Sequence, residues 1–193
     1  MSIYVVRHGQ TDWNRDGAVQ GRYDVPLNET GRAQAREAGV ALQGIHIDKC
    51  YCSPAARARE TAEIALDGRD VPIVFDNRLV EIAYGDYEGT NWRLPEYQKA
   101  RRRIAYRNKN GESYLDVAFR VYGFLEEIRE EAEKSNVLLV CHGGVGRVIH
   151  SYFVDELDND QFIDLLMKNA EVRHYEYVTR NVPAVISDYK KKF

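Results

Sequence analysis

The sequence is poor in several features, and each shortage narrows the class of protein. Three cysteines in 193 residues are too few and too irregularly spaced for a disulfide framework. No apolar stretch approaches the ~20 residues of a membrane-spanning helix. The net charge of −3 gives no reason to expect nucleic acid as a partner. What remains, 44% hydrophobic and 30% charged residues, is ordinary globular composition and argues against disorder.

The start of the sequence lacks the basic region and long apolar core of a signal peptide. We therefore expect a cytoplasmic protein with reduced cysteines and no membrane partner. The length fits a single domain over residues 1–193, because no repeat or linker divides the chain. A stretch around 84–112, where hydrophobic periodicity is lost, is predicted to be a small cap-like insertion. The oligomeric state stays open.

Apolar periodicity and turn residues predict strands that alternate with helices along the chain. Strands are expected at 2–7, 48–52, 71–75, 137–141, 171–178 and 184–187. Helices are expected at 28–43, 53–66, 94–106, from Ser113 onward, and at 145–153 and 161–167. This alternation predicts a three-layer α/β/α fold with a mostly parallel central sheet.

Two of the expected strands end in histidine. The run 3–6 leads into Arg7-His8-Gly9, and the run 137–141 leads into His142-Gly143-Gly144. Continuous apolar runs of this length are typical of strands buried on both faces. Since open α/β sheets bind ligands at the carboxyl ends of their strands, both imidazoles are expected at one site.

His8 is the predicted nucleophile, because a neutral histidine can accept a phosphoryl group and split one displacement into two. Arg7 opposes protonation of the ring and can bind phosphoryl oxygens with its planar fork. Arg57, one turn into the helix expected at 53–66, can complete a phosphate cradle. The alternative, that His8 only hydrogen-bonds a loop, does not explain the arginines and the second histidine.

Two further residues are assigned roles in the same reaction. His142 precedes two glycines and a helix, and it is expected to donate to a phosphoryl oxygen in the transition state. Glu81 is the candidate proton donor to the leaving oxygen. By itself Glu81 would be a surface carboxylate, and its assignment rests on the loop 84–89 that it introduces.

At this point the motifs resemble those of the histidine phosphatase superfamily, in the branch that includes cofactor-dependent phosphoglycerate mutases. The first motif is Arg7-His8-Gly9-Gln10-Thr11-Asp12-Trp13-Asn14. The similarity continues, in the family's order, at 20–27, 31–35, 53–62, 81–89, 111–113 and 141–144. One departure is Pro54, where many relatives carry aspartate.

The resemblance implies a phosphohistidine on His8, held by Arg7, Arg57 and His142. It makes Glu81 the general acid, then the base toward the attacking water, and it implies chemistry without a metal or other cofactor. Asn14 is expected to donate a further hydrogen bond. The predicted substrate-binding residues are Asn14, Thr11, Gln20, Gly21, Tyr84 and Gly143.

Within the family, the surroundings of Glu81 favour a phosphatase over a mutase. Mutases typically follow the catalytic glutamate with Arg-His-Tyr-Gly, whereas Ile82-Ala83-Tyr84-Gly85 stands here. Mutases also carry a longer insertion before the second catalytic histidine, which shields the phosphoenzyme from water. The prediction is therefore a metal-independent phosphatase of small phosphorylated metabolites, with a phosphoglycerate mutase as the alternative.

The substrate is left open by two features of the insertion. Residues 93–109 contain seven basic side chains and one acidic side chain. The basic side chains either bind extra negative charge on a substrate or form the solvated face of a helix, and the second interpretation is favoured. Several aromatic side chains between 84 and 106 suggest an apolar lid, so α-ribazole phosphate is a named candidate. A non-catalytic phospholigand-binding module is the alternative from another class.

Overall fold

Five strands form one sheet at the centre of the computed structural model, which describes residues 2–177. Across the sheet their order is β3 (Ile73–Phe75), β2 (Lys49–Cys52), β4 (Val137–Cys141), β1 (Ile3–Arg7) and β5 (Val172–Tyr175). The first four run parallel, and β5 pairs antiparallel with β1. Every residue of β4 is buried, as a continuous apolar run in mid-sheet requires.

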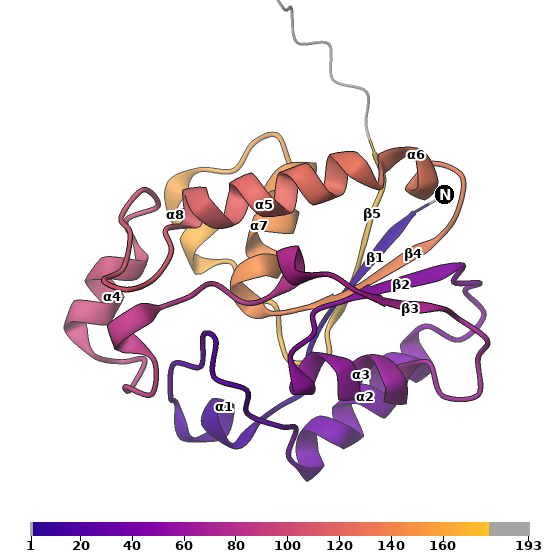
Figure 1. Cartoon of the computed structure of the whole chain (residues 1–193), viewed down its shortest axis with the longest axis horizontal. Coiled ribbons are helices and arrows are strands. Elements are labelled where there is room, and N and C mark those ends of the chain that lie inside the picture. The colour runs from indigo at the N-terminus through magenta and orange to yellow at the C-terminus, as the bar shows by residue number, and fades with distance from the viewer. Residues whose placement is uncertain (1, 178–193) are drawn as a thin grey trace, which may run out of the picture.

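Helices cover both faces of this sheet (Figure 1). On one face lie α2 (Glu29–Ala41) and α3 (Ala56–Ala65), whose alanines pack against the cysteines of β2. On the other lie α5 (Tyr114–Glu127) and α7 (Gly143–Phe153), which share a second apolar cluster with β1 and β4. The predicted three-layer α/β/α fold with a mostly parallel sheet is confirmed.

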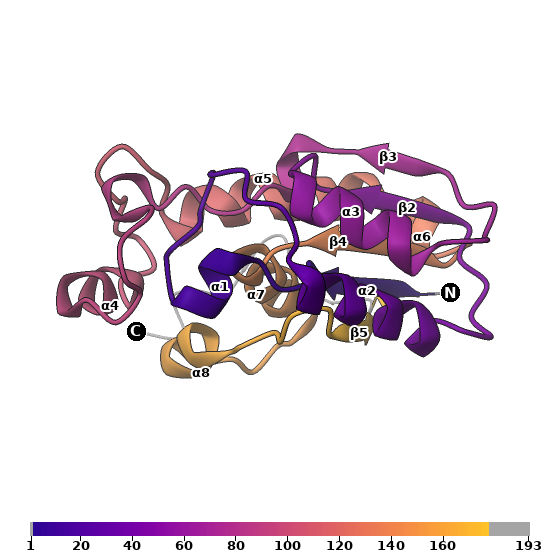
Figure 2. The same ribbon diagram turned by 90° about the horizontal axis from the view of Figure 1, so that it is seen from below.

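The shorter helices lie outside these layers. They are α1 (Asp12–Asp16), α4 (Pro95–Arg101), α6 (Arg129–Ala132) and α8 (Asn159–Asp164). In both views α1, α4 and α8 lie at the end of the molecule opposite the N-terminus, the end toward which β1 runs (Figures 1 and 2). The carboxyl edge of the sheet is therefore surrounded by short helices and loops.

Side-chain caps mark the start of two of the predicted helices. The side chain of Asn28 accepts a hydrogen bond from the Gly31 N–H at the start of α2. Ser113 and Asp116 form a reciprocal capping box at the start of α5. Each cap satisfies backbone donors that the first helical turn leaves unpaired, which fixes where these helices begin.

Other predicted boundaries are wrong. The helix expected from Ser53 begins only at Ala56, because the Ser53 hydroxyl is engaged with His142 and does not cap it. The helix expected at 94–106 ends at Arg101, and the one expected from 145 begins at Gly143. The segment between the first expected strand and the helix expected at 28–43, where no helix is predicted, contains the short helix α1.

Two remaining expectations concern the edges of the sheet. The predicted strand at 71–75 is shorter, starting at Ile73, and the one at 171–178 covers Val172–Tyr175. The strand predicted at 184–187 lies outside the described residues. Within the described part of the chain, no helix has the length and apolar character needed to cross a bilayer.

Candidate active site

A cavity of about 600 Å³ opens at the carboxyl edge of the sheet. The predicted site residues that line it are Arg7, His8, Asn14, Gln20, Gly21, Arg57, Glu81, Tyr84 and Gly143. They come from the end of β1, α1 and the loop after it, α3, the segment after β3 and the start of α7. Residues far apart in sequence therefore meet where two parallel strands end, as expected for an α/β sheet.

His8 follows directly after β1, and its backbone N–H donates to the Cys141 carbonyl at 3.0 Å. The ring is buried, and its Nδ1 lies 2.7 Å from the Gly9 carbonyl oxygen. Since a carbonyl can only accept, Nδ1 carries the proton in this hydrogen bond. The neutral ring then keeps its lone pair on Nε2, the atom required for nucleophilic attack.

The surroundings of His8 keep its ring neutral. Burial, followed by the positive charges of Arg57 and Arg7, lowers the pKa of His8 well below 6.5. Desolvation and nearby cations both disfavour the imidazolium form. The predicted effect of Arg7 on the protonation of His8 thus has the expected sign, although burial is the larger cause.

Two arginines flank the ring, and backbone carbonyls hold both in place. Arg57 is almost fully buried and donates through Nη1 to the Tyr23 carbonyl at 2.7 Å and through Nη2 to the Gly21 carbonyl at 2.9 Å. Arg7 donates through Nη1 to the Met167 carbonyl at 2.7 Å. These contacts fix the guanidinium planes without neutralising their charge.

His142 lies next to His8, with 5.1 Å between the ring centroids. It is completely buried, and its Nε2 lies 2.7 Å from the Ser53 hydroxyl. Burial, followed by the charge of Arg57, lowers the pKa of His142 well below 6.5. A neutral ring that accepts from the Ser53 hydroxyl carries its proton on Nδ1, and that nitrogen can donate to a ligand.

Unpaired polar atoms concentrate at this site. Among the described residues, four buried side-chain atoms have no hydrogen-bond partner: Arg7 Nε, Gln20 Oε1, Arg57 Nε and His142 Nδ1. All four belong to predicted site residues. Because buried polar groups are normally paired, this concentration indicates where an oxygen-rich ligand would bind.

Glu81 is held at the amino end of α7. Its carboxylate accepts from the Gly144 N–H at 3.1 Å, and Oε1 also accepts from the Ile82 N–H at 2.9 Å. A Cβ on Gly144 would lie 2.6 Å from Oε1, so only glycine allows this approach. The acid is thereby fixed in the wall of the cavity, next to the arginine and histidine cluster.

With this geometry in place, comparison with known proteins identifies the family. The sequence pattern of the histidine phosphatase superfamily (branch 1) matches residues 3–185. The chain belongs to this superfamily. The predicted family is thus confirmed by a match that covers nearly the whole chain.

Individual relatives carry both kinds of name. "Probable phosphatase C1687.21" of Schizosaccharomyces pombe is 36% identical over 81% of this chain and 75% of its own length. "Probable phosphoglycerate mutase GpmB" of Escherichia coli is 35% identical over 74% and 70%. The solved structure "Bacillus stearothermophilus YhfR" is 32% identical over 91% of this chain and 90% of its own, with a TM-score of 0.81.

Two of the residues predicted to bind substrate in this histidine phosphatase occupy different places. Asn14 lines the cavity, and its Oδ1 accepts from the Thr11 backbone at 3.2 Å and from Asn169 at 3.4 Å, which leaves its amide nitrogen to donate. Thr11 does not line the cavity. It is fully buried and caps α1 in a reciprocal capping box with Asn14.

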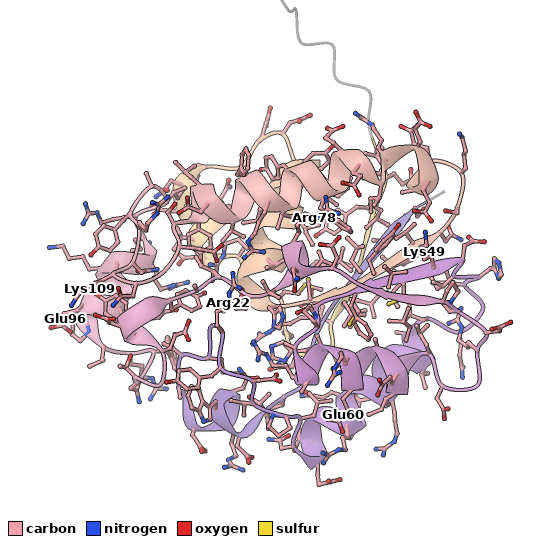
Figure 3. The ribbon with its side chains drawn as sticks, viewed as in Figure 1. Arg22, Lys49, Glu60, Arg78, Glu96 and Lys109 are labelled. Atoms are coloured by element: carbon pink, nitrogen blue, oxygen red, sulfur yellow. The ribbon has the colours of Figure 1, made fainter. Side chains whose placement is uncertain are left out.

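Two carboxylates join the loop that holds Arg57 to the segment that holds Glu81. Glu88 accepts from the Tyr84 N–H at 2.9 Å and the Arg22 N–H at 3.1 Å. Glu112 accepts from the Ala83 N–H at 2.9 Å and pairs with the Arg22 guanidinium at 3.0 Å. Figure 3 labels Arg22 where the loop after α1 approaches this segment. These contacts hold the loop that contacts Arg57 against the segment that carries Glu81.

Sequence reasoning missed several residues that line the cavity. Asn169 donates to the His8 carbonyl at 3.0 Å, and Arg147 and Gln98 also line the wall. Trp92, from the predicted apolar lid, and Arg101, from the basic segment, line the cavity as well. Arg147 lies three positions after Gly144 on α7, so the predicted helix was a signal that could have placed it near the cavity. Asn169 carries no comparable signal, because it lies in a connection whose path depends on packing.

Proposed function

We propose that this enzyme is a metal-independent phosphatase that hydrolyses phosphomonoesters of small metabolites through a phosphohistidine on His8. The observation that carries the proposal is the state of the His8 ring, whose Nδ1 is committed to the Gly9 carbonyl, in a cavity that it shares with two guanidinium groups whose Nε atoms are unpaired. Such positioning and positive charge are what phosphoryl transfer needs from a protein.

In the first step Nε2 of His8 attacks phosphorus and the P–N bond forms while the P–O ester bond breaks. The electron pair of that bond goes to the leaving oxygen, which takes a proton from Glu81. Arg7, Arg57 and the Nδ1–H of His142 donate to the non-bridging oxygens, where charge collects in the transition state. Asn14 adds a further donor.

In the second step the carboxylate of Glu81 takes a proton from water as the water oxygen attacks phosphorus. The P–N bond breaks, its electron pair returns to Nε2 of His8, and inorganic phosphate leaves. Both steps use the same acid in opposite protonation states, as microscopic reversibility allows. The neutral ring of His8 is restored for another turnover.

A phosphoglycerate mutase is the second candidate, because one relative bears that name. The two functions differ in the fate of the phosphoenzyme, which a mutase returns to a second hydroxyl and a phosphatase passes to water. The sequence Ile82-Ala83-Tyr84-Gly85 after Glu81 supports the phosphatase, as does the shorter insertion before His142.

The deciding experiment measures phosphate release and isomerisation side by side. Phosphoglycerate and an aryl phosphate are incubated with the enzyme and a chelator, with and without a bisphosphate primer. We expect phosphate release from both esters at a rate that the primer and chelator leave unchanged. Isomerisation of phosphoglycerate that outpaces release would assign the mutase function instead.

A further inference from the structure

The seven basic side chains of residues 93–109 divide into two groups in the structure. Six of them lie outside the cavity: Arg102 pairs with Asp160 and Asp164, Arg107 with Asp116 and Lys109 with Asp86, Arg93 and Arg103 lie over aromatic rings, and Lys99 is exposed. Figure 3 shows Lys109 at the outer edge of the molecule. Arg101 is the member of this segment that lines the cavity.

Arg101 is held toward the cavity by two neutral groups. Its Nη2 donates to the Ile163 carbonyl of α8 at 2.8 Å, and its Nη1 donates to the side chain of Gln98 at 3.1 Å. Neither acceptor carries a charge. The side chain is half-buried, so its guanidinium is fixed in place while remaining accessible from the cavity.

Arg147 provides a second guanidinium in the same part of the wall. It is buried, and it donates to the Leu165 carbonyl through Nε at 3.3 Å and through Nη2 at 3.1 Å, and to the Tyr114 hydroxyl through Nη1. Among the described residues, neither Arg147 nor Arg101 forms an ion pair with a carboxylate. Burying a charge without a counterion is costly, so a functional reason is expected.

The charges around the cavity leave these two arginines without a counterion. The acids that line it are Glu81 and Asp164, and Asp164 already pairs with Arg102 at 3.0 Å. The proposed reaction requires Glu81 to be protonated before it donates to the leaving oxygen. A phosphate dianion held by Arg7 and Arg57 then balances the inner pair and leaves the outer pair positive.

The position of Arg147 places the excess positive charge on the side of the cavity where the leaving group would lie. Gly144, which holds the Glu81 carboxylate, is three residues before Arg147, a separation of about 4.5 Å along the helix axis. A leaving group that extends from Glu81 into the cavity therefore has Arg147 within reach. Arg101 donates to the Ile163 carbonyl, two residues from the Leu165 carbonyl that holds Arg147. Tyr84 and Tyr97 line the same cavity, and their rings pack edge-on at 5.5 Å.

We propose that Arg101 and Arg147 form a subsite for a second anionic group on the alcohol that the enzyme releases. This inference rests on the proposed function and narrows its substrates to phosphomonoesters whose leaving alcohol carries a carboxylate or a further phosphate. The aromatic faces of Tyr84 and Tyr97 cover the carbon chain between the two anions. Uncharged alcohols occupy the same space without a partner for either guanidinium.

The test compares phosphorylated ω-hydroxy acids of two to six carbons with their uncharged amides, which have the same shape. A parallel series of terminal diol bisphosphates distinguishes a carboxylate from a phosphate as the preferred second anion. For at least one chain length we expect kcat/KM of an anionic ester to exceed that of its amide about tenfold or more, the effect of one charge-assisted hydrogen bond.

Arg101→Gln is expected to reduce the acid-to-amide ratio of kcat/KM by about tenfold. Arg103→Gln, in the same segment but stacked over Tyr106 at the exposed surface, is the matched control and should leave the ratio unchanged. Equal turnover of acids, bisphosphates and amides at every length, or an unchanged ratio in Arg101→Gln, would overturn the subsite alone. Failure to release phosphate from any ester would instead overturn the proposed function.

Discussion

The two halves of the cavity are built differently. The inner half, around His8, consists of buried side chains that follow paired strands or begin helices packed on the sheet. The outer half, around Arg101, comes from short helices and connections beyond the sheet, together with Arg147 of α7. The sheet thus holds the groups proposed to react, and segments outside it line the space proposed for the leaving group.

Strand register explains why the inner half is so closely determined. Arg7 pairs with Cys141 across β1 and β4, so the next residue of each strand, His8 and His142, emerges at the same level of the sheet. No adjustment of a loop is needed to bring the two rings within 5.1 Å. The outer half has no such constraint and can vary without disturbing the reaction.

The largest expected effect comes from removing the proposed nucleophile, which belongs to the inner half. His8→Ala should lower phosphatase kcat by at least about 10⁴-fold, since no other group can form the covalent intermediate. Inorganic phosphate should still bind the arginines, which calorimetry would measure. His46→Ala, at the exposed end of the sheet far from the site, is the control. A His8→Ala enzyme with near-normal turnover would mean that the nucleophile is misassigned.

The next largest effect is expected from removing Glu81, the proposed proton donor to the leaving group. Glu81→Gln should lower kcat about 10²- to 10³-fold for alkyl phosphates, whose leaving oxygen needs a proton. Nitrophenyl phosphate should lose less in the first step, because its leaving group departs as an anion. Equal losses for the two esters, measured as burst rates of alcohol and phenol release, would contradict the assignment of Glu81 as general acid.

A smaller effect is expected from loosening the connection between the Arg57 loop and the Glu81 segment. Glu88→Ala removes the acceptor of the Tyr84 and Arg22 N–H groups, which should cost about 1.5–3 kcal/mol of unfolding free energy. We expect kcat/KM to fall about tenfold because Arg57 and Glu81 lose their alignment with each other. Glu96→Ala, at an exposed position of α4 (Figure 3), is the control in chemical denaturation and kinetics. A Glu88→Ala enzyme as stable and active as this control would refute the role.

The smallest effect, counted per histidine and per pH unit, is a pH dependence of stability that belongs to the inner half. Burial and the neighbouring arginines hold the pKa of His8 and of His142 below 6.5, so the unfolded chain binds protons that the folded chain rejects. The unfolding free energy should therefore fall as pH drops below 6.5, by up to about 1.4 kcal/mol per pH unit for each histidine. Denaturant titrations at pH 7.5, 6.0 and 5.0 measure this slope. His8→Ala should have a shallower slope, and an identical slope would exclude His8 as a contributor.

The inner half could be predicted from sequence because it depends on local rules. An apolar run that ends in Arg7-His8 fixes both the strand and the edge at which the ring emerges, and the same holds for His142. The helix start predicted at Ser53 was wrong because the Ser53 hydroxyl contacts His142. This contact joins the residues that follow two neighbouring strands, β2 and β4. Local capping rules cannot anticipate such a tertiary competitor.

The outer half could not be predicted, because its geometry depends on how short helices pack. Among seven basic residues the sequence favoured a solvated face, and the structure confirms this for most of them. It gives Arg101 a different place because α8 supplies the Ile163 carbonyl that holds it. Neighbours on one helix thus acquire different roles from contacts 62 residues away in sequence.

The central claim is that the His8 ring carries the phosphoryl group, and trapping that intermediate tests it most directly. The enzyme is mixed with a ³²P-labelled ester, quenched within milliseconds in alkali and digested for mass spectrometry. We expect an acid-labile, alkali-stable label on the peptide that contains His8, and no such label in His8→Ala. A label on any other residue, or hydrolysis of the ester without a phosphohistidine at any quench time, would contradict it.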